Sequence, residues 1–289
     1  MKRKTLVMMI SVAAVILVIV FLALMAVYRT SKGSIMQKNE VGVLEVKGVI
    51  MEPDDILKKI KDLEDRDSVK AVIVRIDSPG GGISASQEIY HELKNLDKIK
   101  PVIASFSTVA ASGGYYVALG ARSIFANEGS ITGSIGVIMQ LANLERLFQF
   151  IKVSPITIKS GKFKDIGSSA RAMTPEEKIV LQNLSDNMHM QFKKAVSIER
   201  KLPMNIVNSF ADGRVFSGQQ ALEIKLVDFI GTFGDAVDYA EKTAKISKDA
   251  ELYYPKDDKD GILQNILSST KTFINEAMLG ADSSMPQAR

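Results

Sequence analysis

Cysteine and tryptophan are absent from this chain of 289 residues, and histidine occurs only twice, at His91 and His189. Without cysteine there can be no disulfide framework, no zinc–thiolate site and no cysteine nucleophile. The same absence suits a reducing or an oxidising compartment equally well. No pattern in the sequence calls for a metal or another cofactor, and we expect none.

A strong excess of charge of one sign is also lacking. The formal net charge is +4, and part of it lies at the N-terminus. No long basic stretch is interleaved with aromatic residues, so the sequence predicts no nucleic-acid partner. With 46% hydrophobic and 24% charged residues, the composition is typical of a globular protein.

The N-terminus carries a long apolar run. After Met1-Lys-Arg-Lys4, the residues from Thr5 to Val27 are uncharged and almost wholly apolar. About 23 residues span about 34 Å as a helix, enough for a hydrocarbon core of roughly 30 Å. A cleavable signal peptide would be shorter and would carry a small residue where Leu24 stands. We therefore expect an uncleaved transmembrane signal anchor within residues 1–28.

The basic residues before this run favour a cytoplasmic N-terminus. The chain is then expected to be a single-pass protein of the inner or plasma membrane. The bulk of the chain would face the periplasm or the cell exterior.

Strand and helix patterns alternate after a polar linker at residues 29–40. Val69 to Ile76 is rich in β-branched residues and nearly continuous in apolarity, as in a strand buried on both faces. The alternation predicts an α/β fold with a mostly parallel sheet and helices on its faces. Further strands are expected at 41–46, 101–106, 124–126 and 156–158, and helices at 54–63, 84–96, 113–119 and 175–199.

The helix expected at 175–199 has the clearest start signal, because Thr174-Pro-Glu-Glu177 is a capping box with proline at the first helical position. From about Lys248 the chain is charged and then weakly amphipathic, with no place in the expected core. We assign the main folded domain to residues 41–245 and a polar C-terminal extension to residues 246–289.

Two glycine-rich turns are expected at the ends of buried strands. They are Asp77-Ser-Pro-Gly-Gly-Gly82 and Ala110-Ala-Ser-Gly-Gly-Tyr115. Consecutive glycines let backbone N–H groups face a ligand, as an oxyanion hole requires. Either turn alone is more often a tight turn or a helix cap. Because parallel sheets place their sites at strand ends, the two together favour an active site with Ser112 as nucleophile.

A serine nucleophile needs a base. His91 falls on a charged helical face and His189 within the long helix, and neither lies in a loop of the kind that presents catalytic groups. A lysine can act as the base if burial lowers its pKa from about 10.4, and Ser–Lys pairs are a known variant of the triad. The chain has many lysines, so sequence position alone does not select one.

Further motifs follow the two glycine turns in a definite order. Together, over roughly Gly42 to Ala240, they resemble the signal peptide peptidase A family (peptidase family S49) in its short, single-repeat bacterial form. The additional motifs are Thr132-Gly-Ser-Ile-Gly136, Ser160-Gly-Lys-Phe-Lys-Asp165, Met173-Thr-Pro-Glu-Glu177, Asp212-Gly-Arg-Val-Phe-Ser-Gly218 and Leu226-Val-Asp228.

This resemblance implies the ClpP/crotonase-like fold of stacked βα units and a role for each matching residue. Ser112 matches the nucleophile, and Lys164 matches the general base, which Lys159 and Lys162 do not. Ser134 resembles the residue that orients the lysine amine. The N–H groups of Gly81 and Gly113 would form the oxyanion hole. Lys225 stands where the family commonly has glycine before Leu-Val-Asp. This difference bears on the turn at the end of the preceding helix and not on the catalytic residues.

The resemblance also implies a serine endopeptidase that acts through an acyl-enzyme. It would hydrolyse released signal peptides or other unfolded hydrophobic peptides. In double-length members the lysine and serine come from different halves of one chain. A single-repeat chain would therefore pair Lys164 with Ser112 of a neighbouring subunit, in a homo-oligomeric ring over the membrane.

Three alternatives make different demands on the sequence. A ClpP-like triad requires a histidine some two dozen residues after the serine, and none lies between Ser112 and His189. A crotonase would lack the anchor and would not need Ser112 together with Lys164. A non-catalytic scaffold would not need these residues and both glycine turns intact.

Overall fold

The computed structural model describes residues 16–22 and 39–256. Residues 16–22 are helical, but the remainder of the predicted anchor lies outside the described residues, as do most of the linker and most of the C-terminal extension. Within the two described ranges, no helix is long and apolar enough to cross a membrane.

A single sheet of eight strands forms the centre of the fold, in the order β6-β5-β3-β2-β1-β8, with β4 pairing with β3 and β7. Every pairing is parallel except that of β5 with β6. The predicted mostly parallel α/β sheet is therefore confirmed. The strands are β1 (Glu40–Ile50), β2 (Val69–Gly81), β3 (Val102–Ala111), β4 (Ser123–Ala126), β5 (Ile131–Gly133), β6 (Val215–Ser217), β7 (Phe229–Ile230) and β8 (Glu251–Tyr253).

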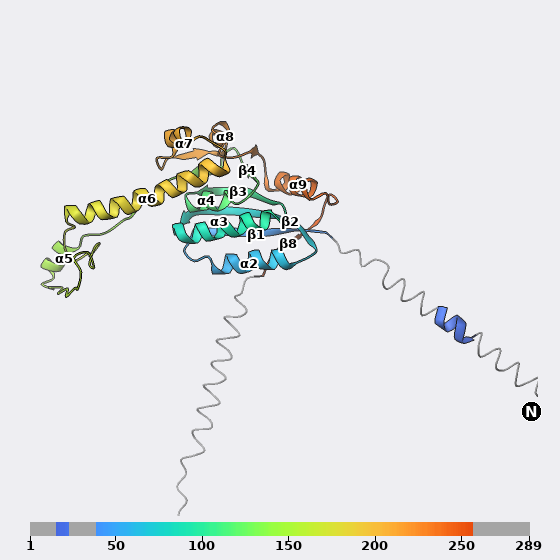
Figure 1. Ribbon diagram of the computed structural model, residues 1–289, viewed down its shortest axis with the longest axis horizontal. Coiled ribbons are helices and arrows are strands. Elements are labelled where there is room, and N and C mark those ends of the chain that lie inside the picture. Colours follow the sequence, from blue (N-terminus) through green and yellow to red (C-terminus); the bar gives the residue numbers. More distant parts are fainter. Residues whose placement is uncertain (1–15, 23–38, 257–289) are drawn as a thin grey trace, which may run out of the picture.

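Strand β2 is buried on both faces, as its apolar run predicts. Val72 and Val74 join the larger core cluster, whereas Ala71 and Ile73 join a smaller cluster on the opposite face. Helices α2 (Asp54–Asp65), α3 (Ile83–Asp97) and α4 (Gly113–Ala118) contribute to the larger cluster, and α9 (Phe233–Ala244) contributes to the smaller one (Figure 1).

Helix α6 (Pro175–Glu199) begins at the predicted capping box, in which Thr174 and Glu177 exchange side-chain and backbone hydrogen bonds. Its C-terminal half packs on the body through Phe192 and Val196, which are buried. The short helices α7 (Met204–Phe210) and α8 (Gly218–Glu223) follow it.

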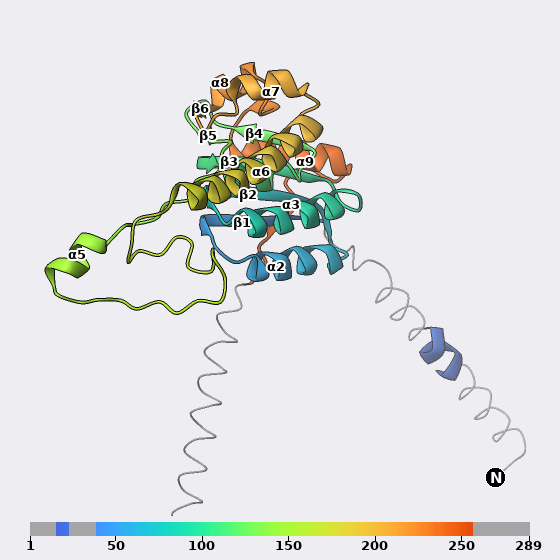
Figure 2. The same ribbon diagram turned by 60° about the vertical axis from the view of Figure 1, so that its left-hand side comes forward.

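The segment between β5 and α6 projects from the body, with the short helix α5 (Glu145–Phe150) near its tip (Figure 2). Its apolar side chains face outward: Ile156 is 87% exposed and Ile158 is 97% exposed. The strand predicted at 156–158 is wrong, because these residues have no neighbouring strand with which to pair within the described chain.

The region after Lys248 also corrects the prediction. Residues Glu251–Tyr253 form β8 and pair in parallel with β1 at the sheet edge, so the polar extension does not begin outside the fold. The Tyr253 hydroxyl donates to Asp62 at 2.7 Å, and the Arg66 guanidinium lies 4.0 Å from the centre of the Tyr253 ring. Lys225 takes the left-handed φ of 63° that glycine would prefer, and the turn after α8 forms nevertheless.

Candidate active site

Ser112 occupies the sharp turn between β3 and α4. Its N–H donates to the carbonyl of Gly133 at 2.8 Å, and its own carbonyl accepts from the N–H of Tyr116 at 2.9 Å. These bonds hold Ser112 at φ 52° and ψ −121°, a conformation that residues with a Cβ seldom adopt. A serine raised on a strained strand-to-helix turn presents its hydroxyl above the end of the sheet, as in other hydrolytic nucleophile turns.

The two glycine turns pack backbone against backbone beside Ser112. Gly80 has φ +102°, and a Cβ placed on it would lie 2.6 Å from the nitrogen of Gly113. A Cβ on Gly113 would lie 3.1 Å from the nitrogen of Gly81. The predicted N–H groups of Gly81 and Gly113 are thus close together. The N–H of Gly113 opens α4 and has no partner within that helix.

Ser78 fixes the first glycine turn, a role that the sequence analysis did not assign. Its hydroxyl donates to the carbonyl of Gly48 at 2.6 Å and accepts from the N–H of Gly80 at 3.1 Å. The serine of the Asp77-Ser-Pro motif is fully buried, which is a local signal for such a role only once the fold is known. The loop beside Ser112 is therefore held by buried hydrogen bonds.

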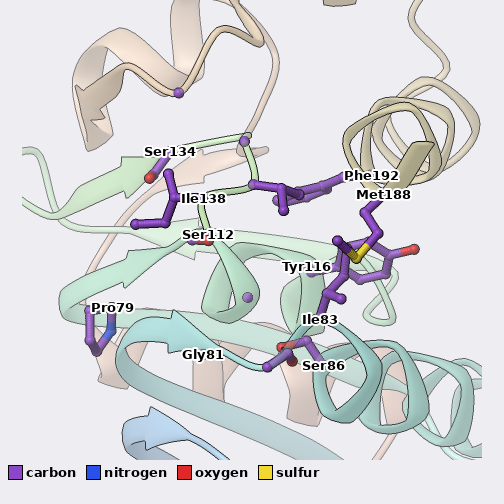
Figure 3. A pocket seen from close by; sticks show the side chains of 15 residues that line it. Pro79, Gly81, Ile83, Ser86, Ser112, Tyr116, Ser134, Ile138, Met188 and Phe192 are labelled. Carbon is purple, nitrogen blue, oxygen red and sulfur yellow. Dashed lines mark hydrogen bonds between the residues drawn. The ribbon is translucent and has the colours of Figure 1, made fainter. Parts of the chain in front are cut away.

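A cavity of about 540 Å³ opens in front of Ser112. Figure 3 shows Ile83, Tyr116, Met188 and Phe192 gathered on one side of it, with Ser112 and Ser134 on the other. The lining is mostly apolar, as expected of a site that binds a hydrophobic group. Gly81, Gly113 and Ser86 complete the wall near Ser112.

Ser134 follows β5, the strand that pairs with the end of β3, and so reaches the same cavity as Ser112. Its N–H donates to the carbonyl of Arg214 at 2.8 Å, and its φ of 50° is again positive. The structure brings four of the five predicted site residues to one cavity.

Lys164 is the fifth, and it lies elsewhere. It is exposed on the projecting segment, within a series of turns, and does not line the cavity. Its neighbours Lys159 and Lys162 pair with Asp165 and Glu176. No ion pair or hydrogen bond among the described residues engages the Lys164 side chain. Among the described residues, Lys162 of this motif therefore pairs with a carboxylate and Lys164 does not.

Neither histidine takes part in the cavity. His189 lies on α6, where its Nε2 is 3.1 Å from the carbonyl oxygen of Ile135, and His91 lies against the ring of Tyr90. A histidine base for Ser112 therefore has no support in the geometry.

The fold and the serine site define a class, the serine-type peptidases with an α/β architecture. The chain belongs to peptidase family S49, whose family model matches residues 94–247. A Synechocystis protein named "Putative protease" is 46% identical over 73% of this chain and 77% of its own length. An Enterococcus faecium protein named "Putative signal peptide peptidase SppA" is 37% identical over 74% of this chain and 62% of its own length.

Other relatives are longer or more distant. The chloroplastic serine protease SPPA of Arabidopsis thaliana is 35% identical over 79% of this chain but only 35% of its own length. Among solved structures, a serine-to-alanine mutant of a membrane-bound stomatin-specific protease aligns with a TM-score of 0.52 and 19% identity, covering 76% of this chain and 98% of its own. That similarity supports the fold alone.

Proposed function

We propose that this chain is a membrane-anchored serine endopeptidase that works through Ser112 and Lys164. The observation that carries the proposal is the placement of Ser112 on a strained turn, with the N–H groups of Gly81 and Gly113 beside it and an apolar cavity in front. These are the parts that acyl transfer to a serine requires.

The Ser112 hydroxyl attacks the carbonyl carbon of the scissile peptide bond while the neutral amine of Lys164 takes its proton. The N–H groups of Gly81 and Gly113 donate to the oxyanion that forms. Lys164 then gives the proton to the departing amine, which leaves an ester on Ser112. Water, deprotonated by Lys164, attacks that ester and releases the acid product and the free hydroxyl. Ser134 lines the same cavity as Ser112, and in this proposal its hydroxyl would orient the amine of the incoming lysine.

The cavity lining supports hydrophobic peptides as substrates. Ile83, Tyr116, Met188 and Phe192 offer an apolar surface beside Ser112, suited to an apolar side chain next to the scissile bond. The enterococcal relative carries the name of a signal peptide peptidase. Released signal peptides and other unfolded hydrophobic peptides therefore fit the site, and the predicted anchor would place it over the membrane.

Lys164 would reach Ser112 of a neighbouring subunit in a homo-oligomeric ring. Within one chain Lys164 stands on the projecting segment and not at the cavity. The exposed apolar side chains of that segment, such as Ile156 and Ile158, would be covered by the neighbour.

The test combines peptide hydrolysis with fluorophosphonate labelling of Ser112. Ser112→Ala and Lys164→Ala should each abolish hydrolysis, because nucleophile and base act as one unit. Lys162→Ala, two positions from Lys164, is the matched control and should keep normal turnover. Near-normal turnover by Lys164→Ala would show that another group is the base.

Co-expression then tests the shared site. Mixed oligomers of Ser112→Ala and Lys164→Ala chains should recover part of the activity, since some neighbours pair an intact serine with an intact lysine. Mixed oligomers without hydrolysis would mean that the two residues meet within one chain.

A further inference from the structure

Four charged side chains of alternating sign form a row of ion pairs on the segment that carries Lys164 and link it to the start of α6. Asp165 accepts from the Lys159 ammonium at 2.5 Å and from Arg171 Nε at 3.0 Å. Arg171 also donates to both oxygens of Glu177, at 2.9 and 2.5 Å. We call these four residues, Lys159–Asp165–Arg171–Glu177, the charge chain. The Arg171 guanidinium donates two hydrogen bonds to Glu177 and another to Asp165. Because its donors lie in one plane, these bonds fix both the distance and the relative orientation of the two carboxylates.

The charge chain ends on the first turn of α6. Glu177 is 3% exposed and its carboxylate also accepts from the N–H of Thr174 at 2.9 Å, inside the capping box of α6. Arg171 holds the pKa of Glu177 at about 2, well below the usual value, through these hydrogen bonds. A buried carboxylate left without its cation is costly, so Arg171 and Glu177 stay together.

The other end of the charge chain acts on the backbone beside Lys164. Asp165 is the next residue, and its side chain is 11% exposed. The N–H of Lys164 donates to the Gly161 carbonyl at 3.1 Å, and the Asp165 carbonyl accepts from the N–H of Ser168 at 3.0 Å. The turn that presents Lys164 is thus tied to α6 through Asp165 and Arg171, while the Lys164 ammonium itself takes no part.

The charge chain is also electrically balanced, with two cations and two anions. Other charged groups at this end of the segment include the Lys162–Glu176 pair, Lys178 on the first turn of α6, Arg146, and Glu145, which accepts from the N–H of Ala172 at 3.1 Å. Removing the Arg171 charge would leave a net negative charge next to Lys164. A nearby negative charge favours the protonated form of an amine.

We propose that Arg171 is a positioning residue for Lys164: it ties the lysine turn to the first turn of α6 and neutralises the carboxylates around it. This inference rests on the proposed function, in which Lys164 is the base. It assigns no contact between Arg171 and the substrate.

The experiment measures kcat, KM and the pH–rate profile of the full-length protein and its variants on one peptide substrate. Arg171→Ala should lower kcat about 10–100-fold with little change in KM, since a displacement near 1 Å at a catalytic group has effects of that size. Its half-maximal rate should move by about half a pH unit toward alkaline pH. Arg171→Lys keeps the charge and loses the fork, so it should restore the wild-type profile with only part of kcat.

Arg122→Ala is the matched control. Arg122 is 38% exposed, compared with 32% for Arg171, and pairs with Asp97 at 2.6 Å far from Lys164 along the chain. It should keep the wild-type kcat and pH–rate profile.

If Arg171→Ala does not fold, Asp165→Asn provides the same test with the opposite sign, a profile shifted toward acid pH. A folded Arg171→Ala protein with wild-type kcat and an unmoved profile would overturn the inference, and so would a lower melting temperature with no change in the profile. Activity retained by Lys164→Ala would instead refute the proposed function, whatever Arg171 does.

Discussion

Replacing Ser112 by glycine should make the protein more stable while abolishing its activity. Ser112 is held at φ 52° and ψ −121°, a conformation that residues with a Cβ seldom adopt and that glycine adopts freely. A residue kept in such a sparsely populated conformation costs about 1–3 kcal/mol. Glycine gives back about 0.5–1 kcal/mol, because its unfolded chain is freer. The net gain is about 0–2.5 kcal/mol.

The matched variant is Ser112→Ala, which removes the same hydroxyl and keeps the Cβ. For a domain of about 200 residues, each kcal/mol shifts Tm by about 2–4 °C. Ser112→Gly should therefore melt up to about 10 °C above Ser112→Ala in thermal unfolding at equal protein concentration. Neither variant should hydrolyse peptide.

The ordinary order of the two residues is the reverse, with glycine the less stable by about 0.5–1 kcal/mol. If Ser112→Gly melts below Ser112→Ala by that margin, the turn stores no strain. The pre-organisation of the nucleophile by strain would then have to be abandoned, although its position at the strand end would not.

Three further predictions concern the turn, the cavity and the charge chain. Gly80→Ala should destabilise the protein by about 2 kcal/mol or more and abolish labelling of Ser112, since its Cβ would lie 2.6 Å from the Gly113 nitrogen; wild-type labelling would contradict this packing. Met188→Glu places a carboxylate in the cavity and should shift the preferred side chain next to the scissile bond from apolar to basic. The cleavage products of a peptide mixture report this preference. An unchanged preference would mean that the side chain next to the scissile bond binds outside this cavity. Hydrogen bonds from Arg171 lower the pKa of Glu177 to about 2 and also lower the pKa of Asp165. The stability that these two carboxylates contribute is therefore complete above about pH 4.5 and is lost as pH falls toward 2. Tm of the wild-type protein should fall over that window, and Glu177→Gln should flatten the fall.

Most of the sheet could be predicted from local pattern, because β2 and its neighbours are short, continuous apolar runs rich in β-branched residues, which is typical of buried strands. The capping box at Thr174 gave the start of α6 to the residue. The short strands β5, β6 and β7 could not be predicted, since two or three residues carry no period and exist only because a partner strand lies beside them.

The error at Ile156 to Ile158 has the opposite cause. Three residues with strand-like composition lie on the projecting segment, where the described chain offers no edge for pairing. These apolar side chains form a surface that the described part of the chain leaves exposed. An apolar sequence pattern indicates that side chains are buried, but it does not distinguish burial within the same chain from burial against another chain.

The site divides in the same way. Ser112, Ser134 and the two glycine turns were predictable as a group because strand ends in a parallel sheet converge, and the fold places them in one cavity. Lys164 came only from the resemblance, and the structure sets it apart on a segment held by ion pairs rather than by a core. The turn of the nucleophile is thus held by buried packing, whereas the segment that carries the lysine is held by ion pairs beside the first turn of α6. In the proposed shared site, each chain would supply its serine cavity to one neighbour and its lysine to another.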